Sequence, residues 1–154
     1  EAAEHPCKGK IMTYLLDPSK EKAAVVDFMA RVSGLEVVQT PKSYVVPPVQ
    51  QWLAGFCDAD FVVTDSFHGC VLSLLLHKKF IAVGNSLRGM SRMNSLLTMF
   101  GLDGRLVQGI DPEDDGEFWL AEPDWDAVDA VLAQQREKSM EFLTGALKKE
   151  VANG

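Results

Sequence analysis

Short apolar runs alternate along the chain with segments whose apolar residues recur at helical spacing. The runs predict strands, and the intervening segments predict helices. The run Phe61–Asp65 is nearly continuous and rich in β-branched residues, which is typical of a strand buried on both faces of a parallel sheet. The expected strands are residues 10–16, 35–40, 61–65, 80–84 and 105–109, and the expected helices are residues 18–33, 49–59, 66–76, 91–100 and 123–149. Their alternation predicts an α/β fold with a doubly wound, Rossmann-like parallel sheet, in which ligands bind at the carboxyl ends of strands.

Capping residues mark the ends of two of these helices. We expect Asp17 to be the N-cap of the first helix, with Pro18 at its first position and Gly34 as its stop. Ser91 is the expected N-cap of the fourth helix, and Gly101 its stop. The last helix is expected to turn an apolar side towards the core along its length, through Trp125, Val128, Leu132, Met140, Leu143 and Leu147.

The length of the chain fits one domain. It has 154 residues, of which 47% are hydrophobic and 24% charged, so it can bury a sizeable core. We expect a loose N-terminal segment over residues 1–9 and a single Rossmann-like domain over residues 10–150. Because the sequence does not begin with Met and enters a strand almost at once, it is expected to be an excised piece of a longer protein.

Charge and cysteine usage narrow the class of partners. The net charge of -7 opposes a phosphate backbone, and no Lys/Arg-rich run offsets it, so nucleic acid is excluded as a main partner. Cys7, Cys57 and Cys70 are odd in number and lack metal-ligand spacing, and the apolar surroundings of Cys57 and Cys70 predict buried free thiols. No apolar run is long enough for an integral membrane segment. These features favour a cytoplasmic protein.

The most informative stretch is Thr64–Gly69, at the end of the expected third strand. Asp65 and Ser66, followed by Phe67-His68-Gly69, place backbone amides, a hydroxyl and an imidazole at the start of a helix, which predicts an anion site. Gly69 would let a ligand approach the first turn. A simpler interpretation is that Asp65 or Ser66 only caps the helix and that the His68 side chain only packs against its neighbours. A nucleophilic Ser66 with His68 as its base is weaker, because residues two apart on a helix point to different sides.

A second polar cluster follows the fourth expected strand. Asn85, Ser86, Arg88 and Arg92 lie in a glycine-flanked loop and at the start of the next helix, where the neighbouring strand would bring them near His68. Two guanidinium groups in an acidic protein suit bidentate capture of carboxylate or phosphate. Either Arg alone could be a solvated surface residue. The joint pattern favours a functional site.

Other chemistry-bearing residues have structural explanations. His77 lies at a helix end, where positive charge complements the dipole. His5 is expected to be incidental. Trp52 and Trp125 are expected to serve core or domain contacts rather than a sugar platform, and Trp119, near the acidic loop, could serve either role. The acidic run at residues 111–115 lacks the spacing of a calcium loop, so a solvated turn is expected.

At these residues the sequence resembles the polysaccharide pyruvyl transferase family, over about residues 10–107. The matching positions include the Thr-Asp-Ser-Phe-His-Gly motif and an Arg-Gly loop. They are Trp52-Leu53, Ala59-Asp60, Thr64–Gly69, Lys79-Phe80, Asn85, Arg88-Gly89, Ser91-Arg92, Ser95–Leu97 and Phe100–Leu102. Lys79 departs from the family, which usually has Pro there.

The resemblance implies a fold and a reaction. The fold would be the C-terminal lobe of a two-lobed B-type (GT-B) glycosyltransferase fold, without its N-terminal lobe. The reaction would add pyruvate from phosphoenolpyruvate as a ketal across two hydroxyls of a sugar in a surface polysaccharide precursor, without a cofactor or a metal. A lipid-linked acceptor would place the protein at the inner face of the membrane.

The resemblance also implies roles for the residues above. His68 would be the catalytic acid, and the donor would be held by Ser66, Gly69, Asn85, Arg88 and Arg92. The isolated lobe would be inactive. The alternatives are a lobe of a nucleotide-sugar-dependent glycosyltransferase, or a non-catalytic remnant that binds ligands.

Overall fold

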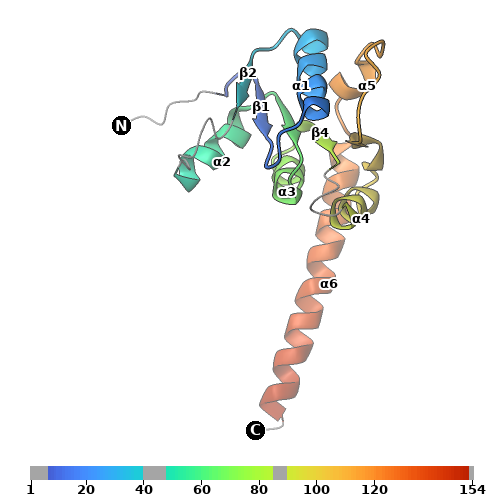
Figure 1. Ribbon diagram of the computed structural model, residues 1–154. Helices are drawn as coiled ribbons and strands as arrows, with labels where there is room; N and C mark the ends of the chain where they lie inside the picture. Colours follow the sequence, from blue (N-terminus) through green and yellow to red (C-terminus); the bar gives the residue numbers. More distant parts are fainter. Residues whose placement is uncertain (1–6, 40–47, 85–89, 153–154) are drawn as a thin grey trace.

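Five parallel strands form the central sheet, in the order β2-β1-β3-β4-β5 (Figure 1). The computed structural model describes residues 7–39, 48–84 and 90–152. Every neighbouring pair of strands in the sheet runs parallel. The strands are β1 (Ile11–Tyr14), β2 (Val37–Gln39), β3 (Phe61–Thr64), β4 (Lys79–Val83) and β5 (Leu106–Val107). This confirms the predicted α/β fold with a doubly wound, Rossmann-like parallel sheet.

Helices cover both faces of this sheet (Figure 1). One face is packed by α1 (Lys20–Ser33) and the short α5 (Glu117–Leu120). The other face is packed by α2 (Val49–Asp58), α3 (Phe67–Leu75), α4 (Ser91–Met99) and the start of α6 (Trp125–Ala152). A 3-10 turn, η1 (Asp103–Arg105), joins α4 to β5.

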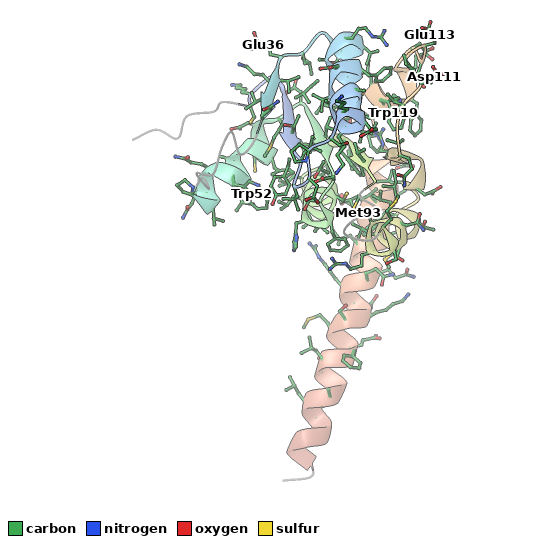
Figure 2. The ribbon with its side chains drawn as sticks, viewed as in Figure 1. Glu36, Trp52, Met93, Asp111, Glu113 and Trp119 are labelled. Atoms are coloured by element: carbon green, nitrogen blue, oxygen red, sulfur yellow. The ribbon has the colours of Figure 1, made fainter. Side chains whose placement is uncertain are left out.

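Alternate side chains of each strand enter two separate cores. On β3, Val62 packs with the α2, α3 and α4 side, whereas Phe61 and Val63 pack with the α1 side. Figure 2 shows Met93 of α4 and Trp119 of α5 on opposite sides of the sheet. All four residues of β3 are buried, as predicted for a strand covered on both faces.

Two of the predicted caps are displaced. Helix α1 begins at Lys20, and its N-cap is Ser19, whose Oγ accepts a hydrogen bond from the Lys22 amide at 3.3 Å. The Asp17 prediction is wrong because the Asp17 amide donates to the Asp65 carboxylate at 3.0 Å, which keeps the chain in a loop before the helix. Ser91 is the first residue of α4 rather than its cap. The predicted stop of α1 is confirmed, since Gly34 is its left-handed C-cap.

Helix α6 extends well beyond the rest of the domain (Figure 1). Only its first turns reach the core, where Val128 is buried and Trp125 packs at the edge. The prediction that the apolar side of this helix faces the core throughout is wrong in its distal half, because Met140, Leu143 and Leu147 are exposed. Helical periodicity identifies a side of a helix, but it does not say how far the neighbouring layer extends.

The described start of the chain packs against the domain. Cys7 is buried, and Lys8 forms an antiparallel bridge with Ala59, so residues 7–9 do not belong to a loose segment. Residues 1–6 lie outside the described part. Cys70 is buried as predicted, but Cys57 is exposed, because it lies on the outer side of α2.

The three thiols should therefore differ in reactivity. Burial raises the pKa of Cys70 to about 12 and also raises the pKa of Cys7. Because the thiolate is the reactive form, a raised pKa and burial both slow the reaction near neutral pH. With a chromogenic disulfide reagent, we expect one thiol, Cys57, to react rapidly in the native chain and all three to react after denaturation. Rapid reaction of Cys70 in the native chain would contradict this packing.

Candidate functional site

The connection from β3 to α3 is fixed by the hydroxyl of Thr64. Its Oγ1 donates to the Tyr14 carbonyl of β1 at 2.8 Å and accepts from the Ser66 amide at 3.1 Å. The turn is thereby attached to two adjacent strands at their carboxyl ends. Thr64, Asp65 and Ser66 are all buried, so the turn is a rigid support for the start of α3.

Asp65 has a role that the sequence analysis missed. Its carboxylate accepts the amides of Leu16 at 2.7 Å and Asp17 at 3.0 Å, and it also pairs with Lys22 Nζ at 2.7 Å. The Lys22 ammonium donates in addition to the Asp17 carbonyl at 2.6 Å. The ion pair is almost fully enclosed, since the side chains are 8% (Lys22) and 0% (Asp65) exposed. Asp65 therefore anchors the loop between β1 and α1.

A signal for this pair was present in the sequence. Lys22 lies at helical spacing with the buried residues Val25, Val26 and Met29, so it stands on the core side of α1. A lysine at such a position requires a partner. The sequence alone does not identify Asp65 as that partner, because the two residues belong to different elements.

The start of α3 carries free backbone donors. Ser66 is the N-cap residue of α3, as the simpler interpretation has it, but its side chain makes no capping hydrogen bond, and His68 is exposed rather than packed. The first helical bond runs from the Cys70 amide to the Ser66 carbonyl at 3.0 Å. The amides of Phe67, His68 and Gly69 have no acceptor among the described residues. These amides, at the positive end of a nine-residue helix, can bind an anion.

His68 is exposed at this helix start, and Arg92 lies close by on α4. The His68 ring meets the edge of the Phe67 ring at a centroid distance of 5.9 Å. The Arg92 guanidinium lies over the same Phe67 ring, 5.4 Å from its centroid. Phe67 thus brings an imidazole and a guanidinium from two helices into one neighbourhood. A shallow hollow of about 330 Å³, lined by Phe67, Arg92, Ser91, Ser95, Leu96 and Met99, continues along this surface.

Two predicted site residues cannot be placed. Asn85 and Arg88, with Ser86, lie outside the described residues, which stop at Gly84 and resume at Met90. The Gly84 amide donates to the Val107 carbonyl at 2.6 Å, so Gly84 is held beside β5 at the end of β4. Because β4 pairs with β3, the end of β4 is next to the start of α3. The convergence of Arg88 with His68 stays a prediction.

Gly69 is required by packing, which sequence reasoning did not foresee. It is buried, and a Cβ at this position would overlap the Thr64 Oγ1 and lie 2.9 Å from the Thr64 Cβ. The Thr64 side chain cannot move away without losing its bonds to Tyr14 and Ser66. A role of Gly69 in admitting a ligand stays a prediction.

Gly69→Ala should accordingly destabilise the fold by about 1–3 kcal/mol, the usual cost of overpacking. Gly145→Ala is the matched control, because a Cβ there meets nothing within 4 Å and alanine favours a helix. We expect chemical denaturation to show a loss for the first variant and no loss for the second. Equal stabilities would contradict the close contact between Gly69 and Thr64.

The other candidates have structural surroundings. His77 Nε2 lies 2.9 Å from Asp129 Oδ1, and the His77 ring stacks on Trp125 at 5.0 Å, so this histidine attaches α6 to the domain. In the acidic loop, Asp111 and Asp114 accept backbone amides within their own turns. Within the described residues, no three His, Cys, Asp or Glu side chains are grouped as metal ligands.

The fold is a Rossmann-like α/β domain in which helix α3 begins at the carboxyl end of a central strand, the place where ligands bind in such sheets. Residues 14–86 match the family model described as polysaccharide pyruvyl transferase. This confirms the family resemblance over a segment that includes Ser66, His68, Gly69 and Asn85, whereas Arg88 and Arg92 lie beyond it. The match implies polysaccharide pyruvyl transferase activity in general terms.

Comparisons with curated proteins and with solved structures gave no significant match. None of the described helices combines the length and apolar character needed to cross a bilayer.

Proposed function

We propose that this chain supplies the donor-binding lobe of an enzyme that transfers pyruvate from phosphoenolpyruvate to two hydroxyls of a sugar, as a ketal. The observation that carries the proposal is the group around Phe67, with exposed His68, Arg92 and three backbone amides that have no acceptor in the described part of the chain. Phosphoenolpyruvate carries both a phosphate and a carboxylate. Helix amides suit the phosphate oxygens, and guanidinium groups suit either anion.

The reaction requires one proton donor and two anion-holding groups. A proton is added to the methylene carbon of phosphoenolpyruvate, and the neighbouring carbon becomes an oxocarbenium-like electrophile. One sugar hydroxyl forms a bond to that carbon, the bond to phosphate breaks, and the second hydroxyl forms the other ketal bond. One proton stays in the new methyl group, and the two hydroxyl protons return to the base and to phosphate.

His68 is the proposed acid, because imidazole is the side chain that exchanges protons most readily near neutral pH. Arg88 and Arg92 would hold the carboxylate or phosphate, while Ser66, Gly69 and Asn85 would complete the donor site. The proposed chemistry needs no cofactor or metal. The complete site would be assembled across a cleft with a second lobe, so the lobe alone would be inactive.

A binding titration tests the donor assignment directly. We expect phosphoenolpyruvate to release or take up heat with the protein in calorimetry, whereas UDP- and GDP-sugars should not. Binding of the nucleotide sugars alone would contradict the proposal and favour a glycosyltransferase lobe. Absence of binding by all of these compounds would favour a non-catalytic remnant.

Arg88→Ala should raise the donor KM of the full-length enzyme by about 10- to 100-fold, with a smaller change in kcat. The reason is that a hydrogen bond to a charged group contributes about 1.5–3 kcal/mol. Steady-state kinetics at varied phosphoenolpyruvate measures this, with Arg136→Ala as the control on the projecting part of α6. An unchanged donor KM in Arg88→Ala would remove this residue from the donor site.

A further inference from the structure

A second cavity, of about 190 Å³, lies at the carboxyl ends of β1 and β2, beside the first turns of α1. It is on the α1 face of the sheet, whereas His68 starts a helix on the other face. Its lining residues are Thr13, Leu15, Pro18, Ser19, Ala23, Val26, Asp27 and Gln39. The volume is far above the roughly 10–15 Å³ that one water needs. It is below the roughly 300–1,000 Å³ of sites for drug-sized ligands, so the occupant must be small.

The polar lining of this cavity is uncharged or acidic. Among the residues that the structure describes, no Lys, Arg or His lines it. The nearby Lys22 ammonium is engaged by Asp65 and by the Asp17 carbonyl. Asp27 and Gln39 are exposed at the rim, and neither side chain has a partner among the described residues. Within the described residues, the Thr13 hydroxyl makes only a long bond, 3.5 Å, to the Val38 carbonyl. An anion would therefore meet a carboxylate, with no compensating cation from the described part of the chain.

The apolar lining suits a ligand with a carbon-hydrogen face. Leu15, Pro18, Ala23 and Val26 supply this part of the wall. A sugar ring presents such a face together with hydroxyls at its edge, and the Asp27 carboxylate and Gln39 amide can bond to those hydroxyls. A purely apolar molecule would leave these two side chains unused. An uncharged sugar unit satisfies both kinds of lining.

The wall of the cavity is also held in place. The loop between β1 and α1 is fixed by the bonds from Leu16 and Asp17 to the Asp65 carboxylate. Leu15, Pro18 and Ser19 of the same loop line the cavity. The buried Lys22–Asp65 pair thus keeps the cavity shaped without a ligand, which lowers the ordering cost of binding.

We propose that this cavity is a saccharide subsite that holds one uncharged sugar ring. The subsite deepens the proposed function, because a sugar is the acceptor in that reaction. The assignment of the cavity to the acceptor rests on the proposed function. Sugar binding itself does not depend on the donor. It can therefore be measured with no phosphoenolpyruvate present.

Two-dimensional amide NMR of the chain, titrated with the methyl glycosides of glucose, galactose and mannose, tests the subsite. We expect at least one glycoside to shift the amide signals of Thr13, Ala23 and Gln39. Ala23→Leu fills the cavity and should abolish these shifts. The neighbouring Ala24→Leu is the matched control, because Ala24 is exposed on the same helix but does not line the cavity, and it should bind as the wild type does.

A second pair of variants tests the polar contact. Asp27→Asn should weaken sugar binding about tenfold or more, because it removes a charged acceptor. Asp60→Asn makes the same charge change just before β3, at the amino ends of the strands and thus opposite the cavity, and should leave the affinity unchanged. Glucuronate should bind more weakly than methyl glucoside, since its carboxylate faces Asp27.

The proposal is overturned if no glycoside shifts these amides, if Ala23→Leu binds as well as Ala24→Leu, or if glucuronate binds best. Failure of the donor site is a separate result. It would appear as the absence of phosphoenolpyruvate-dependent shifts at Phe67, His68 and Gly69. Sugar shifts at the cavity would then support the subsite while removing its assignment to a pyruvyl acceptor.

Discussion

His68→Ala in the full-length enzyme is expected to lower pyruvyl transfer at least about a hundredfold, because a positioned acid contributes about 10²- to 10⁴-fold to such a step. The fold should be intact, since His68 is exposed and its ring only meets the edge of Phe67. Turnover at saturating phosphoenolpyruvate measures the effect. Circular dichroism and the denaturation midpoint report on the fold.

His77→Ala is the matched control for this experiment. It removes an imidazole that contacts Asp129 and Trp125 near the base of α6, away from the start of α3. We expect its turnover to be within a few-fold of the wild type. A near-wild-type rate in His68→Ala would remove this residue from catalysis, and an equal loss in both variants would point to a general effect on structure.

Asp65→Ala is expected to lower the free energy of unfolding by about 3–5 kcal/mol, because it leaves a buried ammonium without its carboxylate. It also leaves the amides of Leu16 and Asp17 without their acceptor. The loss is a large part of the roughly 5–15 kcal/mol that stabilises a domain. Urea denaturation followed by tryptophan fluorescence measures it.

Two further variants distinguish the contribution of the buried Lys22–Asp65 pair to stability from the effect of removing any charge. The double variant Lys22→Met and Asp65→Ala should recover part of the lost stability, because no unpaired charge is then buried. Glu36→Gln removes the partner of Lys10 in an exposed pair and should leave the stability nearly unchanged. A mild effect of Asp65→Ala, similar to that of Glu36→Gln, would contradict the anchoring role of Asp65.

The fold could largely be predicted from the sequence because its signals are local. The β-branched run before Thr64 and the periodic segments on either side of it specify a central strand between two helices, and the structure has β3, α2 and α3 there. The end of α1 at Gly34 was predictable for the same reason, since a left-handed cap favours glycine. The position of the Thr64–Gly69 turn at a carboxyl strand end follows from parallel pairing.

The rest depends on contacts between distant segments. The partner of Lys22 is 43 residues away, so no local pattern identifies it. The close contact of Gly69 with Thr64 depends on the path of the turn, and the exposure of Met140 depends on where the other layers end. Asp is a favourable N-cap residue, but the Asp17 amide donates to the distant Asp65 carboxylate, and this contact outweighs the local capping preference of Asp17.

The proposed reaction begins with protonation of the phosphoenolpyruvate methylene group and ends in a ketal, and isotope incorporation tests this sequence most directly. The full-length protein would be incubated with phosphoenolpyruvate and lipid-linked oligosaccharide acceptors in deuterium oxide, and the product analysed by mass spectrometry and NMR. We expect a pyruvyl ketal whose methyl group carries one deuterium, together with one free phosphate. A sugar product formed only from a nucleotide sugar, or a ketal whose methyl group carries no deuterium, would contradict the account.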